Sequence, residues 1–321
     1  MRRLGCFGLI AVIALIGAAL LVFQDWGGSG PLKRNTSFQV AEGASLAQTA
    51  DRLEKAGAIR SASRFKLYAR LFGAGDPIKA GEYRLPARLS AADILKLLQG
   101  GKTLQRFVTI PEGLPAVLVR ERLMAAKELT GEVAAPIEGT VLPDSYSFQR
   151  GDSRQAVLDR MQNAMVLYLA RAWDARRPGI AVKTPREALI LASIVEKETG
   201  KPSERRQVAA VYANRLKRGM MLQADPTIIY PITKGKPLGR RILRSEIDAK
   251  NGYNTYAMTG LPAGPICNPG RASIDAVLDP AQSNALYFVA DGSGGHVFAD
   301  TLDQHNANVA KWRAYRAAKG I

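Results

Sequence analysis

The segment that most constrains the fold is residues 184–200, because both ends of one helix are marked within it. Thr184 and Glu187 form a Thr-x-x-Glu capping box around a proline at the first helical position. Gly200 suits the left-handed residue that often follows the last turn of a helix. At about 100° per residue, the apolar side chains of this helix gather on one side; they are Ile190, Leu191, Ile194 and Val195. We therefore predict a helix that buries one face in a globular core.

Two glutamates near the end of this helix are expected to have different surroundings. Glu198 falls within the apolar stripe, one turn beyond Ile194, whereas Glu196 falls on the opposite side. Loss of water around a carboxyl raises its pKa, so that it can stay protonated near neutral pH and act as a general acid. The alternative is a last-turn glutamate that reaches solvent or pairs with a basic residue. The pattern makes Glu198 the candidate catalytic residue.

A long apolar run predicts an N-terminal membrane anchor. Leu4–Phe23 contains 20 residues without a charge, about the length that spans a bilayer of ~30 Å. Arg2 and Arg3 precede it, which predicts an N-terminus in the cytoplasm and a body outside the cytoplasmic (inner) membrane. A cleaved signal peptide is the alternative. It is less favoured because the run is longer than a usual signal core and Gly17 to Ala19, its small residues, lie inside the run.

Charge and residue usage narrow the function classes. The formal net charge of +17 in an exported chain favours anionic lipid headgroups or an anionic cell-wall polymer over nucleic acid. Cys6 lies in the apolar run and Cys267 is alone, so no disulfide is expected. The two histidines are not part of a Cys/His cluster, so we predict no metal site and no cofactor. The chain also lacks the Gly-x-Ser-x-Gly elbow of serine hydrolases.

The predicted fold class is α+β, with four segments along the chain. They are a cytoplasmic tip and transmembrane helix at 1–23, a linker at 24–35, a small domain at 36–101 and a larger mixed α/β catalytic domain at 102–321. The small domain has the order strand–helix–helix–strand and resembles the LysM fold, a glycan-binding module. A small packing domain that binds nothing is the alternative. The predicted strands are 37–41, 80–85 and 102–110, the predicted helices are 44–56, 61–72, 91–99, 114–128, 153–176 and 208–217, and a hairpin is predicted at 285–299.

Three polar motifs follow the helix that carries Glu198. They lie at 222–227, 251–256 and 261–270, and each is rich in Pro, Gly or Asn. Asn, Gln, Asp and Thr side chains can satisfy sugar hydroxyls and acetamides, and Tyr rings can lie against pyranose faces. A single cluster of this kind is usually just a turn. Because three such motifs follow soon after Glu198 in the sequence, we expect a sugar-binding site.

In this order, the motifs resemble those of the endolytic murein transglycosylases, the MltG or YceG-like family. The matching segments are Ala192–Thr199, Gln223–Thr227, Tyr253–Tyr256, Leu261–Ile266 with Asn268–Gly270, and Tyr287–Gly292 with Gly295, His296 and Phe298. The loop Glu138–Tyr146 also resembles a family segment, with Ser145 where Thr is usual. The resemblance covers nearly the whole chain.

The resemblance implies cleavage of the MurNAc–GlcNAc β-1,4 bond in nascent peptidoglycan strands, with 1,6-anhydroMurNAc ends. It assigns catalysis to Glu198, which would act first as acid and then as base. We expect substrate binding or support of the transition state from seven further residues: Glu196, Gln223, Asp225, Thr227, Tyr253, Asn254 and Thr255. The implied partners are peptidoglycan strands, the cytoplasmic membrane and penicillin-binding glycan synthases.

Three other functions remain open from the sequence. A hydrolytic muramidase needs a second carboxylate that holds a water molecule, and Asp225 is the candidate. A membrane-anchored scaffold would bind peptidoglycan through the small domain without cutting it. A nucleic-acid binder is suggested by charge alone, and export argues against it.

Overall fold

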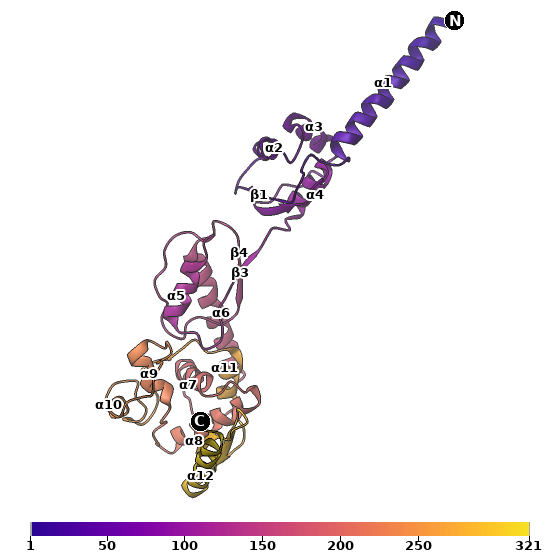
Figure 1. The fold of residues 1–321 in the computed structure, drawn as a ribbon. Helices are drawn as coiled ribbons and strands as arrows, with labels where there is room; N and C mark the ends of the chain where they lie inside the picture. Colours follow the sequence, from indigo (N-terminus) through magenta and orange to yellow (C-terminus); the bar gives the residue numbers. More distant parts are fainter. Residues whose placement is uncertain (1, 321) are drawn as a thin grey trace. The chain divides into compact units, whose positions relative to one another are not determined.

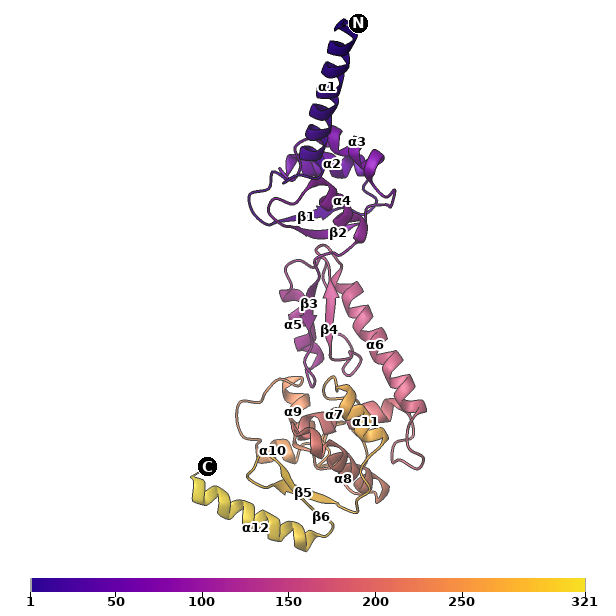
Figure 2. The same cartoon turned by 90° about the vertical axis from the view of Figure 1, so that its right-hand side faces the viewer.

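The chain forms two compact units, Met1–Arg106 and Phe107–Ile321. The structure, a computed structural model, describes the backbone of residues 2–320 and the side chains of residues 12–17 and 19–320. The α+β class predicted from the sequence is confirmed, since helices surround short strands that pair two by two. Figures 1 and 2 show the elements of each unit.

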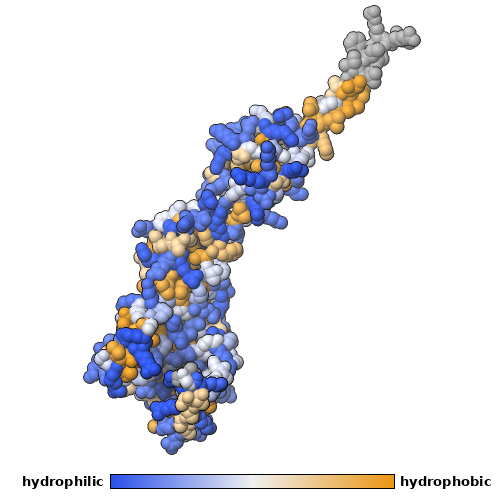
Figure 3. Space-filling model, in the orientation of Figure 1, coloured by the Kyte–Doolittle hydropathy of each residue, from blue (hydrophilic) through white to orange (hydrophobic). Residues whose placement is uncertain are grey.

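Helix α1 (Arg2–Trp26) opens the first unit and contains the run expected to be a membrane anchor. Near its end it presents exposed apolar side chains, among them Leu15, Leu20 and Phe23 (Figure 3). The expected anchor falls partly outside the residues whose side chains are described. Within the described part of the chain, no helix has both the length and the apolar character required to cross a bilayer. The anchor therefore stays a prediction.

The rest of the first unit has the predicted order strand–helix–helix–strand. Its elements are β1 (Thr36–Val40), α2 (Leu46–Lys55), α3 (Ala62–Phe72), β2 (Gly81–Leu85) and α4 (Ala91–Gly100). The strands are antiparallel and pair Thr36 with Leu85. The apolar core includes Phe38, Leu53 and Tyr83. The likeness to LysM rests on element order and stays a prediction.

Helix α6 (Arg154–Asp174) joins the two cores of the second unit. Its first half packs with α5 (Ala116–Ala125), β3 (Arg106–Thr109) and β4 (Ser145–Phe148), and its second half reaches the core around α7. The strand predicted at 102–110 is shorter than expected. Its partner β4 was not predicted, because its first residues belong to a segment whose turn residues suggested a loop.

Helix α7 (Pro185–Glu198) lies at the centre of the second core. It packs against α6, α8 (Arg205–Lys217), α9 (Asp225–Thr233) and α11 (Arg271–Leu278). Every residue from Ala188 to Val195 is buried, so the single apolar stripe predicted from the sequence is wrong. The small residues Ala188, Ala192 and Ser193 let neighbouring segments approach from the other sides, and Ser193 accepts a hydrogen bond from the backbone of Ile266.

The ends of α7 agree only partly with the predicted signals. Thr184 caps the helix by accepting from the backbone of Glu187 at 3.1 Å, as expected. At the other end, Thr199 is extended (φ −139°, ψ 128°), and Gly200 does not adopt the predicted left-handed conformation. Glu198 is therefore the last helical residue, beside the negative end of the helix dipole.

The remaining elements complete the surroundings of α7. They are the 3₁₀ turn η1 (Pro202–Glu204), α10 (Arg244–Ile247), β5 (Tyr287–Ala290), β6 (His296–Ala299) and α12 (Leu302–Lys319). The predicted hairpin is confirmed, and β5 pairs with β6 in antiparallel register. Helices α9, α10, α11 and α12 were not predicted. In α9, prolines at the second position and within the helix had suggested a loop.

Candidate active site

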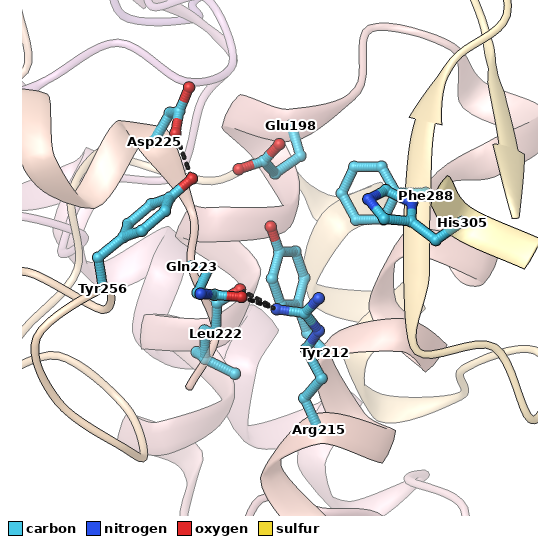
Figure 4. A pocket seen from close by; sticks show the side chains of 9 residues that line it. All are labelled: Glu198, Tyr212, Arg215, Leu222, Gln223, Asp225, Tyr256, Phe288 and His305. Carbon is cyan, nitrogen blue, oxygen red and sulfur yellow. Dashed lines mark hydrogen bonds between the residues drawn. The ribbon is translucent and has the colours of Figure 1, made fainter. Parts of the chain in front are cut away.

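A cavity of about 340 Å³ lies at the end of α7 (Figure 4). It is lined by residues from α7, α8, α9, α12 and β5 and from the loops between them. Its lining is dominated by polar and aromatic side chains: Glu198, Tyr212, Arg215, Leu222, Gln223, Asp225, Tyr256, Phe288 and His305. Three of the residues predicted from the sequence are among them, namely Glu198, Gln223 and Asp225. Such a lining suits a ligand rich in hydroxyl and amide groups.

The Glu198 carboxyl is largely removed from water but faces the cavity. Its Oε1 atom is buried and has no hydrogen-bond partner among the described residues. The pKa of Glu198 is raised to about 7: burial is the largest cause, hydrogen bonding from the Tyr212 hydroxyl opposes it, and the negative charge of Asp225 adds to it. A carboxyl with this pKa exists in both protonation states at neutral pH, as a group that donates and later recovers a proton requires.

Tyr212, which the sequence did not single out, is a hydrogen-bond partner of this carboxyl. Its ring is buried in α8 and meets Phe288 edge-on, with ring centroids 6.0 Å apart. Its hydroxyl points toward Glu198 (Figure 4). Burial, together with the neighbouring Glu198 carboxyl, raises the pKa of Tyr212 well above its usual value. The hydroxyl is therefore a fixed donor to the carboxylate form of Glu198.

Arg215, one turn after Tyr212, was also missed and holds one wall of the cavity. It donates through Nε to the Leu286 carbonyl at 2.7 Å and through Nη1 to the Leu222 carbonyl at 3.0 Å. Nη1 also lies 3.2 Å from Oε1 of Gln223. Gln223 has a left-handed backbone (φ 54°), which is uncommon for a residue with a side chain. Arg215 thus fixes a strained loop at the cavity edge.

Asp225 opens α9 and is joined to Tyr256 on the opposite loop. The Tyr256 hydroxyl donates to Asp225 Oδ1 at 2.6 Å (Figure 4). Burial raises the pKa of Tyr256, and the bond to Asp225 raises it further. The pair therefore forms a polar wall that faces Glu198 across the cavity.

Three predicted binding residues lie beneath this wall and do not line the cavity. Thr227, Asn254 and Thr255 are fully buried. The Thr227 and Thr255 hydroxyls are 2.8 Å apart, and Thr255 accepts from the backbone of Ala224 at 3.0 Å. Asn254 donates to the carbonyls of Ile247 and Ala249 and accepts from the backbone of Tyr256. These residues hold the two loops that carry Gln223, Asp225 and Tyr256.

The other two predicted residues lie outside the cavity. Glu196 accepts from the backbone of Gly270 at 2.9 Å and lies 4.0 Å from Arg205, so it fastens the 268–270 turn. Its side chain is only 7% exposed, because α7 has neighbours on that side as well. Tyr253 packs against Tyr230, with ring centroids 4.8 Å apart.

A second carboxyl, the partly buried Glu138, belongs to the loop that the sequence singled out. It accepts from the backbone of Ala116 at the start of α5, at 2.9 Å. The pKa of Glu138 is raised to about 7, because burial outweighs the lowering effects of the Ala116 bond, Tyr230 and Lys197. Glu138 does not line the Glu198 cavity, and its contacts give it a structural part in joining α5 to α9.

Comparison with known proteins places this geometry in one family. The YceG-like family model matches residues 38–311. The endolytic murein transglycosylase of Bacillus subtilis is 28% identical over 317 residues, which cover 87% of this chain and 85% of that protein. The endolytic murein transglycosylase of Streptococcus pneumoniae serotype 2 is 30% identical over 328 residues. That match covers 87% of this chain but 58% of the longer pneumococcal protein.

A solved structure agrees with the sequence matches. The crystal structure of a putative YceG-like protein from Listeria monocytogenes is 27% identical and superposes with a TM-score of 0.54. The similarity covers 86% of this chain and 99% of the listerial one. Because the family model spans most of the chain, this protein belongs to the YceG-like family.

Proposed function

We propose that the protein is an endolytic lytic transglycosylase that cuts the MurNAc–GlcNAc β-1,4 bond of nascent peptidoglycan strands. Family membership and the names of the relatives support the coarser part of this proposal, an enzyme that acts on peptidoglycan as a transglycosylase. The observation that carries the finer part is the Glu198 carboxyl, which has a pKa of about 7 and a buried oxygen with no hydrogen-bond partner among the described residues.

In the proposed reaction, Glu198 begins protonated. Its proton moves to the glycosidic oxygen as the bond from that oxygen to C1 of MurNAc breaks. The resulting carboxylate takes the proton of the C6 hydroxyl of the same MurNAc, whose oxygen forms the new bond to C1. The products are a strand with an anhydro end and a strand with a free GlcNAc hydroxyl. No water is consumed, and Glu198 returns to its protonated state.

The neighbours of Glu198 have separate parts in this scheme. The Tyr212 hydroxyl stabilises the carboxylate formed after proton donation, and the charge of Asp225 favours the protonated state before it. Asp225 also supplies negative charge near a developing oxocarbenium ion. The exposed amide of Gln223 is placed to bind a sugar hydroxyl or acetamide.

The test is the chemistry of the product ends. Purified glycan strands are digested, and the ends are identified by mass spectrometry. Anhydro ends are expected, and Glu198→Gln should remove turnover while leaving the fold intact. Reducing MurNAc ends would instead make the protein a muramidase. That second candidate is favoured by the presence of Asp225, a second carboxylate, in the same cavity.

The location of the enzyme is part of the proposal. Residues 4–23 would anchor it in the cytoplasmic membrane, with the N-terminus inside and the chain after the anchor outside, close to glycan synthases. The strand–helix–helix–strand unit would hold glycan as LysM modules do. Reporter fusions at the C-terminus test the orientation, and a cytoplasmic reporter would contradict it. Pull-down of the Glu198→Gln variant on peptidoglycan tests whether the protein binds glycan. If the wild type binds peptidoglycan but does not cut it, the protein is a scaffold rather than an enzyme.

A further inference from the structure

A second cavity, of about 350 Å³, is lined by residues that directly neighbour lining residues of the first cavity in the sequence. This is so on both α7 and α9. Glu198 lines the first cavity and Lys197 the second, both at the end of α7. Asp225 lines the first and Pro226 the second, both at the start of α9. The two cavities therefore share a wall, and a ligand held at Glu198 has the second cavity as its neighbour.

The second cavity differs from the first in chemistry. Its lining is mostly aliphatic or proline and includes Leu114, Leu118, Ile229 and Ile266. Sugar rings carry hydroxyls that require polar partners, and unmet buried polar groups cost free energy. An apolar lining suits methyl groups better than a continuation of the glycan.

The charges at this cavity single out one lysine. Among its charged residues, Lys236 donates to Glu121 at 2.8 Å, and Glu112 lies 3.9 Å from Arg205. Lys197 is an exposed residue, and its ammonium, within the described residues, donates a hydrogen bond only to the Gly113 carbonyl, at 3.3 Å. Its charge also lowers the pKa of Glu138. Lys197 therefore retains protons that can bind a carboxylate at the edge of the apolar space.

The far wall of the cavity is held in an unusual backbone conformation. Lys234 is left-handed (φ 56°) although it carries a side chain, and Gly235 follows at φ 83°. A Cβ atom on Gly235 would lie 2.7 Å from Cβ of Pro115, so only glycine allows the turn after α9 to press against the start of α5. Strain of this kind persists where the surrounding structure enforces it, often at ligand sites.

We propose that this second cavity binds the peptide carried by the peptidoglycan strand next to the bond that Glu198 cuts. The inference rests on the proposed function. A MurNAc residue carries a short stem peptide on its lactyl group, with alanine methyl groups and free carboxylates. A strand in the first cavity brings such a stem to the shared wall. The methyl groups enter the apolar space, and a carboxylate pairs with the Lys197 ammonium.

Two substrates that differ only in their peptides test this site. One is the native strand, and the other is the same strand stripped of its stems by an amidase. Lys197→Met keeps the length of the side chain and removes its charge. It is expected to raise KM for the native strand by roughly two- to five-fold, as for loss of a partly exposed ion pair. KM for the stripped strand should not change, and Lys197→Arg should retain most of the native affinity.

Two further variants separate this effect from general damage. Lys183→Met removes an exposed lysine that lines neither cavity and should leave KM for both substrates unchanged. Leu238→Glu places a carboxylate in the second cavity and should weaken the native strand but not the stripped one. Equal losses on both substrates, or no change on either, would overturn the proposal.

Failure of the proposed reaction is distinguishable from failure of this site. A wild type that cuts neither substrate contradicts the proposed function but not the binding site. Calorimetric titration of the full chain with free stem peptide then decides. Binding by the wild type that weakens in Lys197→Met supports the site, whereas the absence of binding by the wild type overturns it.

Discussion

At the residue scale, the chemistry of Glu198 depends on two neighbours that act in opposite directions. Its pKa of about 7 is raised mainly by burial, lowered by the Tyr212 hydroxyl and raised by the Asp225 charge. A proton donor loses activity as the pH rises through its own pKa. The two neighbours therefore offer a direct way to move the pH profile of the enzyme.

We expect kcat/KM of the wild type to fall as the pH rises through about 7, because the protonated fraction of Glu198 falls. Asp225→Asn removes the charge that favours protonation and should move this alkaline limb to lower pH. Tyr212→Phe removes the donor that favours the carboxylate and should move the limb to higher pH. Profiles of all three proteins on one glycan substrate check this. Shifts in the same direction would show that another group titrates.

The same carboxyl should make stability depend on pH. Its pKa is about 7 when folded and near 4.5 when exposed, so folding favours the protonated form. This contribution is fully present below the unfolded pKa and is lost as the pH rises through about 7. Glu198→Gln stays neutral at every pH. Relative to wild type, it should gain up to roughly 3 kcal/mol between pH 4.5 and 8.5.

Denaturant unfolding at the two pH values measures this difference. Glu138, whose pKa is also raised to about 7, is present in both proteins, and its own pH dependence therefore cancels in the comparison. The prediction fails if the difference in unfolding free energy between the wild type and Glu198→Gln is the same at both pH values. The Glu198 carboxyl would then be solvated in the folded state.

At the scale of the elements, the site is built from loops fastened by buried polar side chains. The sequence predicted α7, its N-cap and Glu198, because caps and apolar spacing are local signals. It placed Thr227, Asn254 and Thr255 with the substrate, since polar residues in turns look alike whether they face a ligand or the backbone. Tyr212 and Arg215 were missed. Their placement depends on how α8 packs against α7 and β5, which residue spacing does not encode.

The Thr227–Thr255 pair tests whether buried polar side chains fasten the loops of the site. Thr255→Val keeps the shape but leaves the backbone N–H of Ala224 without its buried acceptor and removes the bond between the two hydroxyls, while the Thr227 hydroxyl keeps its bonds to the Ala224 carbonyl and the Thr255 backbone. It should cost about 1–3 kcal/mol of stability and lower activity by releasing the Gln223 loop. Thr227→Val with Thr255→Val should cost less than the sum of the single changes. Denaturant unfolding of the four proteins checks this, and strict additivity would contradict a shared network.

At the scale of the whole molecule, chemistry and the predicted anchor belong to different units. The cavity at Glu198 and the neighbouring apolar cavity are lined by residues of the second unit alone. The first unit has its own core and carries α1. Catalytic competence should therefore depend on the stability of the second unit, while tethering depends on the first.

A matched pair of core truncations tests this separation. Leu53 is fully buried in the first unit and Leu191 is 1% exposed in the second. Each Leu→Ala change should cost about 2–5 kcal/mol within its own unit, because it removes buried methyl groups and leaves a cavity. In calorimetry of the full chain in detergent, Leu53→Ala should lower one thermal transition and Leu191→Ala the other. Only Leu191→Ala should lower the temperature at which cleavage of glycan strands is lost. A single transition that both variants shift alike would mean that the two cores unfold together, and tethering and catalysis would then share one stability.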